Sequence, residues 1–338
     1  MSGPQQPAVA RFWTADAGQA RCLLCPHECL LDEGQTGLCN VRKVEDGQLR
    51  SLVYGHPVGG AVDPIEKKPL FHFRPASATY SYATVGCNLA CTFCQNYTLS
   101  QVQGSVAQDS YVPAETLVED AIKAGCRTLA HTYSEPTIFL EYALDVARAG
   151  NARGLDSVFV TNGFIGDAAR EEVAATISAA NIDLKAFSDL TYRTVCRGRL
   201  QPVLDSIVSL VAAGVWVEVT TLVVPGLNDS PAELGDIARF LASVSPAIPW
   251  HVSRFHPSFH MTDRGVTPAA TLAAARTAGA EAGLQFVYIG NLPGANGEDT
   301  ICPSCQNVVV RRHHFTVVEN LLNKGSCHFC GHQLAGVW

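Results

Sequence analysis

The sequence predicts an α/β protein built on a parallel, partial (β/α) TIM-like barrel, with a cysteine-rich extension before the barrel and a zinc-ribbon-like module after it. Two observations lead to this fold class. Seven apolar, strand-like runs alternate with helical stretches, and most of the 13 cysteines fall into three tight groups. We therefore place the extension at residues 1–75, the barrel at residues 76–292 and the C-terminal module at residues 293–338.

The composition is that of a globular protein with an acidic balance. Hydrophobic residues make up 47% of the chain of 338 residues, and the net charge is −7. A nucleic-acid-binding protein is expected to carry a basic patch or run, and the sequence shows neither. Residues 1–18 lack the apolar core of a secretory signal, and no apolar run reaches membrane-spanning length. We expect a cytoplasmic monomer that binds neither nucleic acid nor membrane, with its grouped cysteines acting as metal ligands.

The first cysteine group belongs to the N-terminal extension. Residues 1 to about 20 show little pattern and are expected to form a loose tail. The group that follows consists of Cys22, Cys25, Cys29 and Cys39. Four thiolates can complete a tetrahedral zinc site or bind an auxiliary iron–sulfur cluster. The spacing of the cysteines is compatible with both sites and also with thiols that bind no metal. Further on, Glu66, Lys67 and Lys68 are interpreted as solvated surface charges.

The barrel region repeats a unit in which a helix ends at a glycine and a strand follows. The strand candidates are residues 79–85, 126–133, 155–161, 181–186, 215–224, 249–255 and 284–290. Near-continuous apolar runs are typical of parallel strands that are buried on both faces. Four helices end at a glycine, which suits the left-handed position after a helix. The glycines are Gly125, Gly154, Gly214 and Gly283. Ser230 and Glu233 have the spacing of a capping box, which predicts that a helix begins there.

The loop after the first predicted strand carries the second cysteine group. It has the sequence CNLACTFC (residues 87–94), which contains Cys87, Cys91 and Cys94. Three thiolates in one tight loop can bind three irons of a [4Fe-4S] cluster and leave the fourth iron open, which favours chemistry over scaffolding. The alternative is a structural zinc ion that borrows a distant fourth ligand.

Polar residues lie at or just after the end of each predicted strand. After the cysteine loop these are Ser134, Glu135, Thr161, Asn162, Asp183, Lys185, Glu218, Thr220, Arg254, His256 and Asn291. Active sites of (β/α) barrels lie at the carboxyl ends of the strands. We therefore expect these side chains to share one pocket with the cysteine loop.

The third cysteine group lies in the C-terminal module. Two CxxC pairs, about twenty residues apart, flank a β-rich stretch at residues 308–322. They consist of Cys302, Cys305, Cys327 and Cys330. This spacing predicts a zinc ribbon, for which a rubredoxin-like iron site is the alternative because it uses the same ligands. Most metal sites of this kind stabilise a segment that is too small to fold alone. The alternative is a functional role for the module in docking a partner protein or in electron transfer.

The cysteine loop, with an aromatic residue before its last cysteine, resembles that of the radical S-adenosylmethionine (SAM) enzymes. More of the chain resembles one branch, the radical SAM protein of the AmmeMemoRadiSam system, which is related to the activating enzymes of glycyl radical enzymes. The resemblance is carried by DPIEKKPL (63–70), GCNLAC (86–91), TYSEPTI (132–138), DLKAF (183–187) and GVW (336–338). It covers nearly the whole chain and implies a (β/α)6 barrel that is open on one side.

The resemblance also implies a reaction. A reduced [4Fe-4S] cluster would cleave SAM to methionine and a 5′-deoxyadenosyl radical, which abstracts hydrogen from an unknown substrate. The implied electron donor is a flavodoxin- or ferredoxin-type protein, and the implied partners are Memo-type and AMMECR-type proteins. Zinc is expected in addition at the C-terminal cysteine group, from its spacing, whereas the N-terminal group stays open between zinc, an auxiliary cluster and unligated thiols.

Roles for the pocket residues follow from the same resemblance. Ser134 and Glu135 would bind the SAM amino group, although Glu135 can also be a carboxylate at a helix start. Thr161 and Asn162 would contact the ribose. Asp183 and Lys185 would meet the SAM carboxylate or a substrate anion, or form a structural ion pair. Arg254 is expected near SAM, and His256, like Lys185, is a candidate catalytic residue.

Two other functions remain open at this stage. An activating enzyme that installs a glycyl radical on a partner protein would need an uncovered barrel mouth, whereas an enzyme for a small molecule would need a lid. A non-catalytic metal-binding scaffold would depend on the two outer cysteine groups and not on Cys87, Cys91 and Cys94. Cys126 and Cys196 are interpreted as buried small hydrophobic residues.

Overall fold

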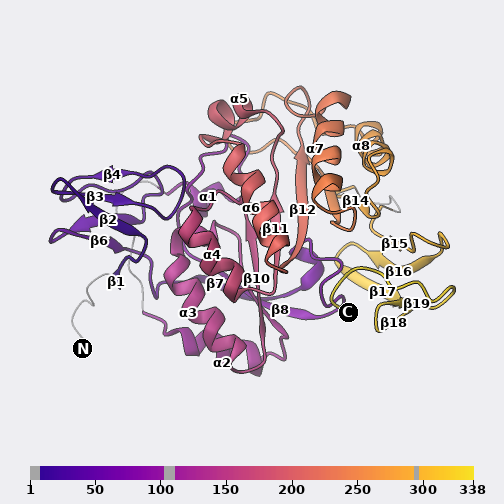
Figure 1. The fold of residues 1–338 in the computed structure, drawn as a ribbon, viewed down its shortest axis with the longest axis horizontal. Coiled ribbons are helices and arrows are strands. Elements are labelled where there is room, and N and C mark those ends of the chain that lie inside the picture. The colour runs from indigo at the N-terminus through magenta and orange to yellow at the C-terminus, as the bar shows by residue number, and fades with distance from the viewer. Residues whose placement is uncertain (1–7, 103–110, 293–296) are drawn as a thin grey trace.

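The computed structural model describes residues 8–102, 111–292 and 297–338. A central barrel-like α/β unit lies between two β-rich segments, which are found at opposite ends of the long axis (Figure 1). No helix in the described ranges is both long and apolar enough to cross a membrane.

The N-terminal segment consists of two small antiparallel sheets. One has the order β2-β3-β4 and the other β1-β6-β5. The strands are β1 (Ala8–Val9), β2 (Trp13–Asp16), β3 (Gln19–Cys22), β4 (Leu30–Leu31), β5 (Arg42–Glu45) and β6 (Gln48–Ser51). The predicted loose tail is therefore wrong for residues 8–20, which are paired and partly buried, while residues 1–7 lie outside the described residues. Such short strands carry too little alternation to be recognised in the sequence.

The central sheet has eight strands in the order β14-β13-β12-β11-β10-β9-β8-β7. All seven predicted strands are present and run parallel: β8 (Ala78–Ala83), β9 (Thr128–His131), β10 (Asp156–Thr161), β11 (Ala179–Asp183), β12 (Trp216–Val223), β13 (Trp250–Arg254) and β14 (Val287–Gly290). β7 (Val58–Pro64) adds an antiparallel edge next to β8. Consecutive parallel strands that are neighbours in the sheet agree with a partial (β/α) barrel.

Helices follow the parallel strands and form the outer layer (Figure 1). The long ones are α2 (Ala114–Lys123), α3 (Leu140–Asn151), α4 (Asp167–Thr176), α6 (Gln201–Ala212), α7 (Pro231–Val244) and α8 (Ala269–Glu281). The four predicted glycines after helices all have positive φ, as expected. Ser230 caps α7 by accepting from Glu233 N at 3.2 Å. The capping box is incomplete, because the Glu233 carboxylate accepts from Phe187 N at 2.8 Å instead.

Short helical turns shape the loops at the carboxyl ends of the strands. They are η1 (Ile65–Lys67), α1 (Tyr97–Ser100), η2 (Pro136–Phe139), α5 (Asp189–Thr191) and the π-helical turn η3 (Tyr192–Cys196). Single π turns often occur at functional sites. Here η3 leads directly into the loop that faces the second cysteine group, as described below.

The C-terminal module is the expected β-rich unit. Its strands are β15 (Thr300–Ile301), β16 (Val308–His313), β17 (Thr316–Asn320), β18 (Leu322–Asn323) and β19 (Ser326–Cys327). They form a three-stranded sheet and a two-stranded sheet. Arg312 links the module to the segment that precedes the barrel, since its Nη2 donates to Phe71 O at 2.7 Å, while its Nη1 donates within the module to Thr300 Oγ1 at 2.8 Å.

A buried polar network fills the amino-terminal end of the barrel. Glu218 near the start of β12 accepts from Phe71 N at 3.0 Å and from His72 N at 2.7 Å, and it contacts His251 Nε2 at 2.7 Å. His72 also contacts the Tyr288 hydroxyl at 2.5 Å. The expectation that Glu218 joins the pocket at the carboxyl ends is therefore wrong, because a strand has two ends and sequence position alone did not distinguish them.

The charged run after β7 also differs from the expectation. Glu66 and Lys68 are buried, with only 1% and 2% of their surface exposed. Glu66 accepts from Ala76 N at 2.9 Å, and Lys68 Nζ donates to Asp63 at 2.7 Å. Only Lys67 is largely exposed. The prediction that the charged run is solvated is therefore wrong for Glu66 and Lys68. Both side chains have hydrogen-bond partners, which lower the free-energy cost of burying their charges.

Candidate active site

A cavity of about 430 Å³ opens at the carboxyl ends of the parallel strands. Its size lies within the range of small-molecule sites. Among the predicted residues, it is lined by Cys87, Cys91, Cys94, Ser134, Glu135, Thr161, Asn162, Asp183, Lys185, Thr220 and Asn291. The structure thus brings together most of the side chains that the strand ends were expected to contribute.

The cysteine loop is held in place by the π turn of the fourth βα unit. Ala90 N donates to Cys196 O at 2.9 Å, and Thr92 N donates to Val195 O at 3.1 Å. These two backbone hydrogen bonds join the cysteine loop to the last two residues of η3. Cys196 is buried as predicted, and its place beside the loop has no signal in the sequence because it depends on a tertiary contact.

The loop thiols have unequal environments. The neighbouring Cys196 thiol lowers the pKa of Cys91 against the effect of burial, and the charge of Lys185 acts in the same direction. Burial raises the pKa of Cys87 and of Cys94. The three thiols of the loop therefore differ in their surroundings, and Cys91 is the one that faces both Cys196 and Lys185.

Glu135 is the most completely bonded carboxylate of the cavity. Its Oε1 accepts from Thr137 N at 3.0 Å, Thr137 Oγ1 at 2.6 Å and Thr161 Oγ1 at 2.7 Å. Its Oε2 accepts only from Asn162 N, at 2.8 Å. Glu135 therefore caps the η2 turn, as the alternative interpretation proposed, and Oε2 keeps acceptor capacity toward the cavity. Burial raises the pKa of this carboxyl.

Asn162 connects the cavity to the cysteine loop. Its side-chain amide donates to Asn88 Oδ1 at 2.8 Å and contacts Cys87 Sγ at 3.7 Å. Its own carbonyl oxygen accepts from Phe164 N at 2.8 Å. Asn162 thus fixes the position of the first cysteine as well as lining the cavity.

Lys185 and Asp183 form an ion pair at the cavity wall. The Nζ–Oδ2 distance is 2.9 Å, and the lysine side chain is only 15% exposed. Burial alone would lower the pKa of Lys185, but Asp183 and the thiols of Cys91 and Cys196 raise it well above the usual value. The cation therefore stays charged and faces the cysteine loop.

A second lysine cluster lies at the cavity, formed by residues that the sequence favoured as solvated surface charges, although the resemblance left a role near the cysteine loop open. Asp63 accepts from Lys67 Nζ and Lys68 Nζ, each at 2.7 Å, and from the Tyr133 hydroxyl. Lys67 and Lys68 both line the cavity, and Lys68 Nζ lies 4.3 Å from the centre of the Tyr133 ring. Tyr133 has a φ of +64°, an uncommon value for an aromatic residue, and such residues are concentrated at functional sites.

Besides Glu218, two predicted residues lie outside the cavity lining. Arg254 Nε donates to Thr267 O at 2.9 Å, and His256 is exposed. Neither is among the residues that line the cavity. Ser253 and Asn291 contribute the polar groups at this side, and Asn291 Nδ2 donates to Ser253 Oγ at 2.9 Å. Ser253, the preceding residue of the strand, lines the cavity in place of Arg254 because alternate residues of a strand face opposite sides.

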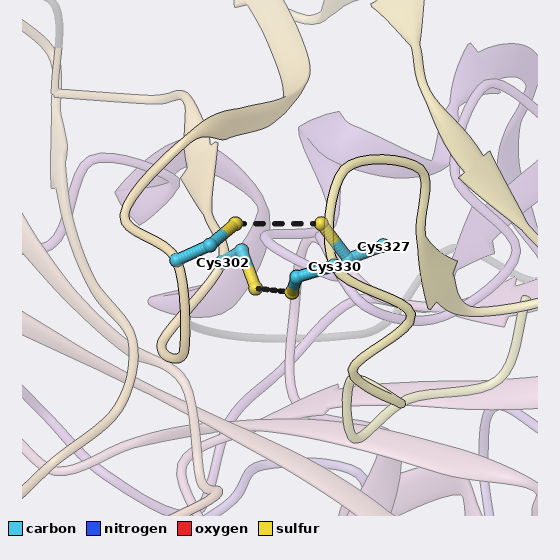
Figure 2. A group of neighbouring side chains, drawn as sticks. Cys302, Cys327 and Cys330 are labelled. Atoms are coloured by element: carbon cyan, nitrogen blue, oxygen red, sulfur yellow. Dashed lines mark hydrogen bonds between the residues drawn. The ribbon is translucent and has the colours of Figure 1, made fainter.

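The C-terminal module brings its four cysteines into one metal-binding geometry. The sulfur atoms of Cys302, Cys305, Cys327 and Cys330 all lie within 4.8 Å of one another. Cys302 faces Cys330 at 3.7 Å, and Cys305 faces Cys327 at 3.6 Å (Figure 2). With metal–sulfur bonds of about 2.3 Å, four such thiolates can surround one tetrahedral ion.

The four N-terminal cysteines also converge. They line one small cavity together with Arg42 and Asn88. Their sulfur atoms are not gathered as closely as those of the C-terminal module, since that module is the only set of three or more such ligands within 4.8 Å in the described ranges.

The fold and the cavity define a parallel α/β barrel protein with three cysteine thiols in a cavity at the carboxyl ends of its strands. Residues 81–241 match the Radical SAM superfamily. The chain is also 39% identical over 323 residues to the uncharacterized protein MJ0808 of Methanocaldococcus jannaschii, which covers 94% of this chain and 96% of that protein. The chain belongs to the radical SAM superfamily.

The chain is also similar to solved structures. SuiB of Streptococcus suis, solved with S-adenosylmethionine bound, has a TM-score of 0.50 and 14% identity over 68% of this chain and 53% of SuiB. This chain thus spans about half the length of SuiB. A domain of the pyruvate-formate lyase-activating enzyme of Bacteroides vulgatus has a TM-score of 0.43 and 19% identity, over 48% of this chain and 99% of that domain.

Superfamily membership implies an iron–sulfur cluster and SAM, and the residues present fit both groups. The three thiols of the cysteine loop line the same cavity as Lys185 and Glu135. In addition, the buried Ser134 hydroxyl has no hydrogen-bond partner among the described residues. A buried polar atom without a partner is costly, so a ligand that pairs with it is favoured here.

Proposed function

We propose that the protein is a radical SAM enzyme that binds a [4Fe-4S] cluster through Cys87, Cys91 and Cys94 and cleaves SAM reductively. When bound, the two groups supply a 5′-deoxyadenosyl radical, which abstracts hydrogen from the substrate. The observation that carries this proposal is the shared cavity, in which three thiols, an unpaired Ser134 hydroxyl and the Glu135 carboxylate meet.

The surrounding residues position the ligands. Glu135 Oε2 has room to accept from the SAM ammonium, and Ser134 can pair at the same end. Thr161 and Asn162 hold Glu135 in place and are proposed to contact the ribose. Lys185 stays charged and is proposed to meet the SAM carboxylate or an anionic group of the substrate. Leu89 and Phe93 line the cavity and help to exclude water.

The electron donor, the partner proteins and the metal of the C-terminal module are proposed in addition. The electron donor we propose is a flavodoxin- or ferredoxin-type protein. The five motif runs described above support a place in the AmmeMemoRadiSam system, with Memo-type and AMMECR-type proteins as partners. The four cysteines of the C-terminal module are proposed to hold zinc, because their spacing suits one tetrahedral ion.

A second candidate function is activation of a partner protein by formation of a glycyl radical. In the described ranges, the residues that line the cavity include none from 8–66 and none from 297–338. Of the N-terminal extension only Lys67 and Lys68 line the cavity, and the C-terminal module contributes no lining residue in its described part, which favours access by a protein segment.

Reductive SAM cleavage is tested under anaerobic conditions. The protein is reconstituted with iron and sulfide, reduced with dithionite and mixed with SAM, and 5′-deoxyadenosine is quantified. We expect the nucleoside from the wild type and from Cys126→Ala, whose cysteine lies outside the three groups. The triple variant Cys87→Ala, Cys91→Ala, Cys94→Ala should give none.

Two results would change the assignment. Equal nucleoside from the triple variant would reject the cysteine loop as the cluster site. If the wild type binds and reduces a cluster but releases no nucleoside, even with the candidate partners added, the metal-binding scaffold becomes the better reading.

A further inference from the structure

The N-terminal cysteines form a site of their own, distinct from the active-site cavity. Cys22 ends β3, Cys25 and Cys29 lie in the following turn, and Cys39 precedes β5. Cys22 N donates to Cys29 O at 2.9 Å, which closes this turn. All four thiols line one small cavity whose walls include Leu24 and Leu31, both buried. Free thiols have no need to converge in this way from separate segments.

The spacing of the thiols separates two kinds of metal site. Four thiolates around one ion must lie about 4 Å apart, because each metal–sulfur bond is about 2.3 Å long. The C-terminal module has this spacing, whereas no three of the N-terminal sulfur atoms lie within 4.8 Å of one another. The same holds for Cys87, Cys91 and Cys94. An iron–sulfur cluster places several irons and sulfides between its cysteines, so it requires this wider spacing.

Arg42 supplies an independent observation at the same cavity. It lines the cavity and is only 1% exposed. Its Nη2 pairs with Glu141, but its Nε and Nη1 have no hydrogen-bond partner in the part of the chain that the structure describes. A buried guanidinium with two unused donor nitrogens is costly. Thiolate and sulfide sulfur atoms carry negative charge and would accept from both nitrogens.

We propose that Cys22, Cys25, Cys29 and Cys39 bind a second, polynuclear iron–sulfur cluster, with Arg42 donating to its sulfur atoms. Four cysteines complete the ligation, so this cluster has no open iron for SAM. The proposal is independent of the function proposed for Cys87, Cys91 and Cys94.

The second site lies directly against the loop of the first. His27 Nε2 contacts Asn88 O at 2.7 Å. A Cβ added to Gly86 would lie 2.8 Å from Cys39 O, so only glycine permits this approach. The two clusters would thus occupy neighbouring segments of the chain.

The test removes the first site and asks whether a cluster remains. The variant Cys87→Ala, Cys91→Ala, Cys94→Ala is reconstituted anaerobically with ferrous iron and sulfide. Iron and acid-labile sulfide are quantified, and iron–iron scattering is measured by X-ray absorption. We expect stoichiometric labile sulfide and a short iron–iron distance. Adding Cys25→Ser and Cys39→Ser should remove both signals, whereas adding Cys126→Ser should leave them unchanged.

A second measurement does not depend on how well the N-terminal variant folds. In the reconstituted triple variant, the four N-terminal cysteines should resist alkylation until acid releases the iron, as read by mass spectrometry. The absence of labile sulfide, or binding of a single zinc or iron ion without sulfide, would overturn the proposal. So would sulfide that persists while all four N-terminal cysteines are alkylated.

Discussion

At the scale of single residues, Glu135 serves both the fold and the cavity. Three donors occupy its Oε1 and cap the turn before α3, while Oε2 has only one partner. A carboxylate offers about four acceptor positions, divided between its two oxygens. The sequence analysis gave two alternative roles for Glu135, a cap at a helix start and a ligand of the SAM amino group. In this geometry one carboxylate oxygen can serve the first role and the other oxygen the second.

Replacing Glu135 by Gln should weaken SAM binding more than it weakens the fold. A hydrogen bond to a charged group contributes about 1.5–3 kcal/mol, which corresponds to roughly 10- to 100-fold in affinity. Isothermal titration of the reconstituted protein with SAM measures this effect, with the exposed Glu115→Gln as the matched control. Unchanged affinity together with a lowered melting temperature would leave Glu135 with the capping role alone.

His131 should make stability depend on pH. It is fully buried, its Nδ1 contacts the Tyr82 hydroxyl at 2.7 Å, and its Nε2 has no partner among the described residues. Burial lowers the pKa of His131 to about 3, against 6.5 for a free histidine. The unfolded chain thus binds a proton between these values that the folded protein does not. The free energy of unfolding is therefore expected to fall as pH drops from 6.5, by up to about 1.4 kcal/mol per pH unit.

The variant His131→Gln keeps an acceptor for Tyr82 and does not titrate. Urea unfolding should be measured at several pH values. As the pH falls, the free energy of unfolding should decrease less steeply for this variant than for the wild type or for His256→Gln, whose histidine is exposed. Part of the pH dependence of the unfolding free energy should remain in His131→Gln, because burial also lowers the pKa of His72 to about 4. Identical slopes for all three proteins would exclude His131 as a source.

The sequence predicted the residues of the cavity unevenly. The cysteine loop and Glu135 could be recognised because their residue types and spacing are tied to a chemistry. The burial of Lys68 could not, because it depends on tertiary contacts with Asp63 and with the ring of Tyr133. His256 follows a strand closely in sequence, yet the chain turns it outward.

At the scale of elements, the barrel strands were predictable, whereas the strands between residues 8 and 20 were not. Each parallel strand is a long apolar run buried on both faces, which is a strong signal. The N-terminal strands have two to four residues and are only partly buried. Their order is set by the turns between them and by contacts with the barrel, which no local pattern records.

The C-terminal module should depend on its metal for local order. Its sheets have short strands, and many residues of β16 and β17 are exposed. We expect that Cys305→Ser, or removal of the metal by a chelator, speeds hydrogen exchange across residues 300–330 at least tenfold, because metal binding supplies much of the folding free energy of such modules. Exchange in the barrel helices should change little. Uniformly unchanged exchange would show that packing against the barrel is sufficient.

At the scale of the whole molecule, the last residues close the amino-terminal end of the barrel. Val337 N donates to His72 O at 2.7 Å, and Arg74 N donates to Val337 O at 2.6 Å. Trp338 packs against the His72 ring, with ring centres 5.0 Å apart. The segment at residues 72–74, which follows the DPIEKKPL run, thus meets the GVW run near the buried polar network, although the two are far apart in the sequence.

Trp338→Ala should lower the free energy of unfolding by about 2 kcal/mol, since a half-buried tryptophan loses less than a fully buried one. Urea titration followed by circular dichroism measures the change. Phe329→Ala is the control, because Phe329 is exposed, and it should stay within about 0.5 kcal/mol of the wild type. Equal effects of the two substitutions would mean that the Trp338 contact adds nothing to stability.

The contact between His72 and Ala335 joins residues 263 positions apart. Closing so long a loop costs more chain entropy than forming each βα unit, whose strands pair with neighbours close in sequence. We therefore expect the barrel to assemble from its local units first and the amino-terminal end to close last during folding. Pulse-labelled hydrogen exchange should then protect the amide of Leu129 in β9 before that of Val337.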